Sequence, residues 1–110
     1  MPLMEAFLAG APAACSNVTC LPELAGDASL LFDPGRPTEI AEAIRRLWTD
    51  GALRATLADR GRRNVSRFTW ERTARIFRAH YRRLANRTLS DEDHALLDGS
   101  KDSYYLTTEV

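Results

Sequence analysis

Hydrophobic positions in the first third of the chain fall into short runs of the kind that form buried strands. The runs at 12–16 and 29–32 have the length and composition of parallel strands covered on both faces. A short helix is predicted over 3–10, and Gly10 suits the left-handed residue that ends a helix. A single helical turn is predicted at 22–24, between the two strands. The pattern therefore predicts helix, strand, turn and strand in this order.

Helical periodicity dominates the next part of the chain. Apolar residues recur on one face of three stretches, 37–49, 51–66 and 70–86. Asp50 and Thr69 precede the second and third of these and are suitable N-caps. The third stretch has an apolar stripe with spacings of 4, 3, 4 and 3, which is typical of a packing face. Its members are Trp70, Ala74, Phe77, Tyr81 and Leu84.

Beyond Thr88 the periodicity disappears and the charge changes sign. Residues 1–87 carry 14 Arg and nine acidic residues, a net charge of +5, whereas residues 88–110 carry one Lys and six acidic residues, a net charge of −5. We interpret 88–110 as an acidic flexible tail. The arginines are spread along the predicted helices and match no known nucleic-acid motif, so we expect no nucleic-acid partner.

Composition narrows the class of protein. The chain has 110 residues, 45% hydrophobic and 27% charged, which indicates one small globular domain at most. No apolar run approaches the roughly 20 residues of a membrane-spanning helix, and no basic segment marks a secretory signal.

Cys15 and Cys20 have no second pair of ligands, so we expect two reduced thiols, no metal and a cytoplasmic location. Three N-glycosylation sequons occur, at Asn17, Asn64 and Asn86, and in a cytoplasmic protein we expect them to carry no glycan.

Four motifs occur in order along the chain. The run 2–12, Pro-Leu-Met-Glu-Ala-Phe-Leu-Ala-Gly-Ala-Pro, is followed by 16–28, which contains Pro-Glu-Leu-Ala-Gly-Asp-Ala. Leu-Phe-Asp-Pro follows at 31–34, and Phe-Thr-Trp-Glu-Arg-Thr-Ala at 68–74, with Tyr81 beyond it. This ordered set resembles the C-terminal domain of retaining GT-B glycosyltransferases of glycosyltransferase family 4, the glycosyl transferases group 1.

The resemblance implies an α/β fold that is a partial Rossmann-like fragment, with two short parallel strands and about four helices. Residues 1–87 would be the second half of a nucleotide-sugar-binding domain, and the tail 88–110 has no counterpart. The parent enzyme would transfer a sugar from a nucleotide-sugar donor with retention of configuration, using no further cofactor and no metal. Its N-terminal domain would be missing here, so we expect the fragment itself to be inactive. The parent enzyme could also bind peripherally to a membrane.

One site residue follows from the resemblance. In the family two glutamates are separated by seven residues, and the second contacts the ribose of the donor nucleotide. Glu5 matches this second glutamate, whereas the first would precede the chain. A carboxylate can accept hydrogen bonds from both vicinal ribose hydroxyls, as in dinucleotide-binding folds. The alternative is that Glu5 is only a first-turn acid that stabilises a helix N-terminus. We expect no catalytic residue and no metal ligand within the chain.

Three other hypotheses concern partners. The chain could be a non-catalytic interaction module that pairs with a partner chain carrying the missing half. An unpaired strand edge could promote self-association. The last residues, 107–110, read Thr-Thr-Glu-Val, and a C-terminal Thr-x-Val can add as a strand to a PDZ groove.

Overall fold

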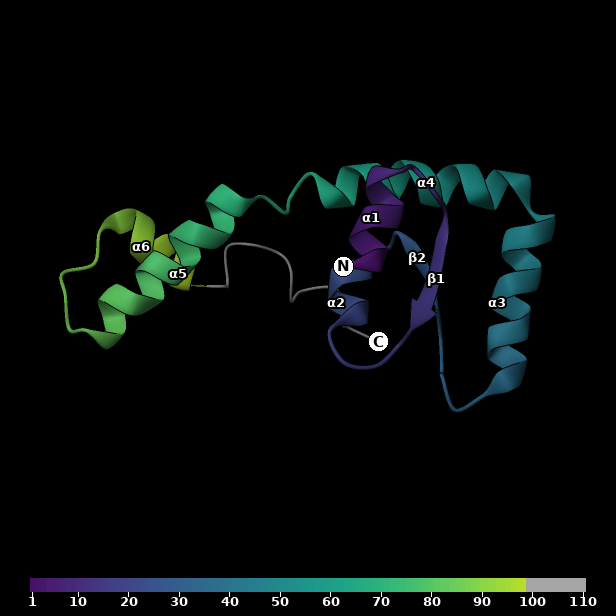
Figure 1. The fold of residues 1–110 in the computed structure, drawn as a ribbon, viewed down its shortest axis with the longest axis horizontal. Helices are drawn as coiled ribbons and strands as arrows, with labels where there is room; N and C mark the ends of the chain where they lie inside the picture. Colours follow the sequence, from purple (N-terminus) through teal and green to yellow (C-terminus); the bar gives the residue numbers. More distant parts are fainter. Residues whose placement is uncertain (99–110) are drawn as a thin grey trace. The chain divides into compact units, whose positions relative to one another are not determined.

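A computed structural model describes residues 1–98 and confirms an α/β fold with two parallel strands (Figure 1). Six helices accompany the strands in this part of the chain, two more than expected, and both additions are short. In chain order the elements are α1 (Pro2–Leu8), β1 (Ala13–Ser16), α2 (Leu21–Ala25), β2 (Ser29–Phe32), α3 (Pro37–Thr49), α4 (Gly51–Val65), α5 (Trp70–Leu84) and α6 (Asp91–Leu97). None of these helices is long and apolar enough to cross a membrane.

The two strands pair in parallel over their whole length. The register runs from Ala13 opposite Ser29 to Ser16 opposite Phe32, and the Asn17 N–H extends the ladder with a 2.8 Å bond to the Phe32 carbonyl. Neither outer edge has a strand partner within residues 1–98. Self-association through such an edge stays a prediction.

The chain divides into two compact units, residues 1–67 and residues 68 onward. The first unit contains both strands and has a small core. Its buried apolar residues are Phe7, Ala25, Ala28, Ala43, Leu57 and Ala58, of which only Phe7 and Leu57 are large. Whether residues 1–87 act as one functional domain stays a prediction.

Two of the long helices, α4 and α5, start at the N-cap residues that the sequence predicts. The Asp50 carboxylate accepts a 2.9 Å hydrogen bond from the Leu53 N–H, and the Thr69 hydroxyl accepts one of 3.1 Å from the Arg72 N–H. Each cap satisfies a backbone donor that has no partner inside its helix. Both caps confirm the expected starts of α4 and α5.

A buried asparagine joins α4 to the C-terminal end of α2. The Asn64 side-chain amide donates to the carbonyl oxygens of Leu24, at 2.6 Å, and Ala25, at 3.3 Å. These carbonyls lie in the last turn of α2, where helices lack their own donors. Asn64 is only 6% exposed, so the folded unit shields this sequon, whereas Asn17 and Asn86 are exposed.

The expectation of a flexible tail is wrong for residues 91–97, which form α6 on the side of α5. A reciprocal capping box starts this helix: the Ser90 hydroxyl accepts from the Asp93 N–H, and the Asp93 carboxylate accepts from the Ser90 N–H. Sequence reasoning treated the acidic run as solvated because it lacks an apolar stripe. The rest of the predicted tail, 99–110, including the PDZ-type ending, lies outside the described residues.

Candidate functional site

Glu5, the predicted ribose ligand, lies in α1 with its side chain 73% exposed. Its carboxylate contacts the amino group of Met1 at 3.0 Å. An exposed ion pair of this kind is weak and exchanges readily with other partners. The carboxylate is therefore accessible to a ligand.

The helix that carries Glu5 is anchored from its opposite face. Phe7 is fully buried against α4, and its ring lies so close to Gly61 that a Cβ atom there would be 2.7 Å from a ring carbon. Residues two positions apart on a helix point in nearly opposite directions, so burial of Phe7 turns Glu5 outward. Gly10, with φ of +70°, ends the helix, and the Gly10 N–H bonds to the Phe7 carbonyl at 3.0 Å. The position of Glu5 is thus set by packing on α4.

A second group of polar residues lies in the loop after β2 and the first turn of α3. Glu39 accepts hydrogen bonds from the Asp33 N–H at 2.9 Å and from the Arg36 guanidinium at 2.8 Å. These donors lower the pKa of Glu39, the Asp33 N–H most strongly. Asp33 in turn accepts from the Gly35 N–H at 2.8 Å. The loop therefore holds a fixed shape at the carboxyl end of a strand, the edge at which open α/β sheets bind ligands.

Two hollows lie in the first unit. One of about 250 Å³ is lined by Leu30, Leu31, Thr38, Glu39, Glu42, Ala43 and Arg46. Another of about 310 Å³ is lined by Asp27, Arg60, Arg63, Asn64 and Arg67. Glu5 lines neither of these two hollows, and its side chain is exposed.

The cysteines and the acidic residues were the remaining candidates for covalent or metal chemistry. Cys15 and Cys20 are both free, and burial raises the pKa of the Cys15 thiol, which keeps it neutral. Within residues 1–98, no three His, Cys, Asp or Glu side chains gather closely enough to hold a metal ion.

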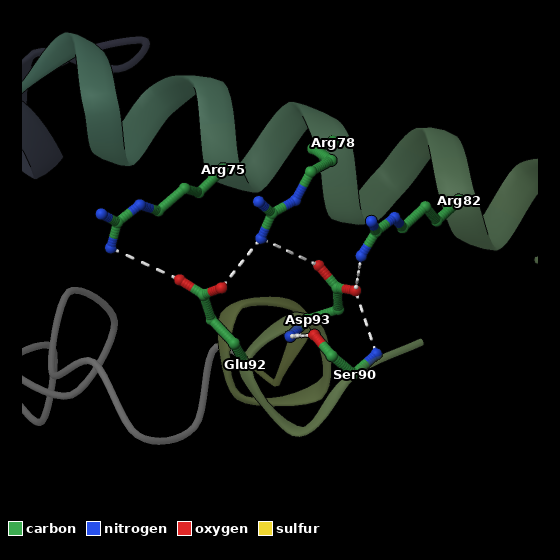
Figure 2. Close-up of polar contacts among 6 residues, drawn as sticks. All are labelled: Arg75, Arg78, Arg82, Ser90, Glu92 and Asp93. Atoms are coloured by element: carbon green, nitrogen blue, oxygen red, sulfur yellow. Dashed lines mark hydrogen bonds and ion pairs between the residues drawn. The ribbon is translucent and has the colours of Figure 1, made fainter. Parts of the chain in front are cut away.

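Sequence reasoning missed a polar network in the second unit (Figure 2). Three arginines of α5 reach toward α6: Arg82 contacts the Asp93 carboxylate at 2.8 Å, and Arg75 and Arg78 contact Glu92 at 3.4 and 2.9 Å. Asp93 is fully buried, and the Ser90 N–H and the Arg82 guanidinium hold its pKa well below the ordinary value. The Ser90–Asp93 capping-box spacing was the available signal. The network joins the two helices of the second unit.

The family model for glycosyl transferases group 1 matches residues 1–64, more than half of the chain. The chain belongs to this family. The matched segment contains the anchored helix α1, both strands and nearly all of α4, so the family match and the first compact unit cover almost the same residues.

Relatives in Escherichia coli are mannosyltransferases. The O-antigen chain mannosyltransferase B is 39% identical over 71 residues, which cover 64% of this chain and 19% of that protein. The serotype-specific mannosyltransferase WbdA is 30% identical over 76 residues, which cover 69% of this chain and 9% of that protein. This chain therefore spans a fifth or less of the length of these relatives. No solved structure matches it significantly.

Proposed function

We propose that this chain is part of the nucleotide-sugar-binding domain of a GT-B glycosyltransferase of family 4, which transfers mannose with retention of configuration. The family match over residues 1–64 supports sugar transfer, and the names of the relatives suggest mannose. The observation that carries the proposal is the geometry of Glu5: an exposed carboxylate on a helix that Phe7 fixes to α4.

Glu5 would bind the donor through its two carboxylate oxygens. Each oxygen accepts one hydrogen bond from the vicinal ribose hydroxyls, and a charged acceptor makes these bonds stronger than neutral ones. To bind in this way, the hydroxyls replace the exposed contact with the Met1 amino group. Because Phe7 anchors α1, the backbone that carries Glu5 is already held in place, and binding has to order only the Glu5 side chain.

The chain by itself should not transfer sugar. A GT-B active site lies between two domains, and stabilising the developing charge requires preorganised groups on both sides of the donor. Among residues 1–98 we assign only Glu5 to the donor and no residue to catalysis. We therefore expect donor binding that is weak, and no turnover.

A titration of the chain with GDP-mannose, UDP-linked sugars and the free nucleotides, followed by NMR, tests the proposal. Losing hydrogen bonds to a charged acceptor costs about 1.5–3 kcal/mol, so Glu5→Ala should weaken donor binding on the order of ten- to a hundredfold. Glu23→Ala is the matched control, since Glu23 is also an exposed acid in the first turn of a helix that has proline at its start. Equal affinities for Glu5→Ala and the unchanged chain would remove Glu5 from the site.

Nucleotide release from the same donors measures activity. The expected result is no release above the rate of spontaneous hydrolysis. Turnover that persists through purification, and that Glu5→Ala abolishes while Glu23→Ala does not, would contradict the proposed inactivity of the chain and keep the role of Glu5.

A further inference from the structure

The apolar stripe of α5, defined as Trp70, Ala74, Phe77, Tyr81 and Leu84, faces away from α6. Ala79 is fully buried, and Arg75, Arg78 and Arg82 reach α6 (Figure 2). Phe77 lies two positions before Ala79 and so points in nearly the opposite direction. The large members of the stripe are 55–86% exposed. The most apolar face of α5 is therefore the uncovered one.

The spacing of the stripe selects a helix as its partner. Apolar residues at intervals of 4, 3, 4 and 3 follow the 3.5-residue repeat of a coiled-coil seam, which packs against a second seam at a small angle. The rings of Phe77 and Tyr81 already pack together, with centroids 6.1 Å apart. Ordering them on binding therefore costs little side-chain entropy.

We propose that α5 pairs in antiparallel orientation with α5 of a second copy of this chain. In the antiparallel register, Ala74 faces Phe77 of the second copy and Trp70 faces its Tyr81, so the one small residue meets a large one. A parallel pair would place Ala74 against Ala74 and Trp70 against Trp70, leaving a void in one layer and crowding the other.

Charges beside the stripe favour the same orientation. Glu71 and Arg78 lie seven residues apart on one flank, and Glu71 has no ion-pair partner among the described residues. Arg78 contacts Glu92 and Asp93 through a single terminal nitrogen, so its other two nitrogens can donate to a further acceptor. In the antiparallel pair, Glu71 of each copy lies across from Arg78 of the other, which gives two ion pairs related by symmetry.

The dimer should be weak. One helix of this length buries less than the roughly 1,200–2,000 Å² of a stable complex, so we expect dissociation constants in the range of tens of micromolar. The pairing does not rest on the proposed function, because it uses only residues of the second unit.

Sedimentation of the full chain over a range of concentrations tests the pairing. The unchanged chain should shift from monomer to dimer, and Phe77→Gln should weaken association by about tenfold or more while circular dichroism shows the same helix content. Trp48→Gln is the matched control, since Trp48 is an equally large, 85% exposed apolar residue on α3, and it should leave association unchanged. A monomer at every concentration, or a dimer that only Trp48→Gln weakens, would overturn the proposal.

Disulfide formation tests the orientation. In a background of Cys15→Ser and Cys20→Ser, the variants Thr73→Cys and His80→Cys place one thiol each on the other flank of the stripe. Antiparallel pairing brings position 73 of one copy near position 80 of the other, so a mixture of the two variants should form covalent dimers and neither variant alone should. Efficient self-linking of each variant alone would indicate a parallel pair and overturn the antiparallel register.

Discussion

At the scale of the residue, the Phe7 ring packs closely against Gly61. This contact joins α1 to α4 and sets the direction of Glu5, although Gly61 carries no chemistry. A glycine inside a helix normally destabilises it relative to alanine by up to about 1 kcal/mol. Here glycine is required because the Phe7 ring occupies the space where a Cβ atom would lie.

Gly61→Ala should therefore destabilise the first unit. Forcing a methyl group into a filled site typically costs about 1–3 kcal/mol, which exceeds the gain in helix propensity, so we expect a net loss of about 1–2 kcal/mol in a denaturant titration. Gly51→Ala in the same helix is the control: its Cβ would meet only the Arg54 side chain, at 3.5 Å, and stability should stay equal or rise slightly. If the two substitutions have equal effects, the Phe7–Gly61 contact does not limit packing.

At the scale of the element, a network of ion pairs joins α6 to α5. Arginines of α5 meet Glu92 and the buried Asp93 of α6, and Asp93 also completes the capping box with Ser90 (Figure 2). One carboxylate thus starts its own helix and attaches it to its neighbour. The pairing of α5 with α6 therefore depends on Asp93 being ionised.

Acidification should release α6 from α5. The pKa of Asp93 is lower in the folded chain than its ordinary value of 3.8, so its contribution to stability is complete well above that value and is lost as pH falls below it. Helicity at 222 nm should fall in this range for the unchanged chain. Asp93→Asn should show reduced helicity already at neutral pH. Its further loss of helicity on acidification, the acid step, should be smaller than that of the unchanged chain.

Asp91→Asn provides the control for that titration. Asp91 is an exposed acid in the first turn of α6 and should leave the acid step in place. An acid step of the same size in Asp93→Asn and Asp91→Asn would assign the transition to other carboxyl groups.

At the scale of the whole molecule, the described residues combine a small core with several exposed large apolar side chains. The buried apolar residues of 1–98 are mostly alanines, whereas Ile44, Trp48, Trp70 and Phe77 are all more than half exposed. The two short strands, whose outer edges have no strand partner within residues 1–98, add little hydrophobic burial.

We therefore expect the chain to be mostly helical but loosely packed in isolation. The far-UV circular dichroism should be strong and the near-UV signal weak, and a dye specific for exposed apolar surface should bind. Elution on size exclusion should depend on concentration. A sharp cooperative melt from a strictly monomeric species would contradict this expectation and indicate a self-sufficient domain.

Local signals in the sequence determined most elements of the described chain. The strand at 29–32 and the helix at 37–49 have the expected bounds, and Asp50 and Thr69 cap their helices as predicted. These features depend on neighbours within a few residues, so they can be inferred without the fold. The ordered motifs likewise indicated the glycosyl transferases group 1, and the match over residues 1–64 confirms this part of the prediction.

Tertiary structure alone decided which faces those elements bury. The apolar stripe of α5 was expected to pack but is exposed, while the opposite, arginine-rich face holds α6. The space at Gly61 and the bonds of Asn64 to α2 join residues about 40–55 positions apart, which no local pattern encodes. Sequence likeness named Glu5, but its exposure and orientation follow from Phe7 packing on α4. Periodicity determines that a helix has an apolar face, whereas long-range packing determines what covers that face.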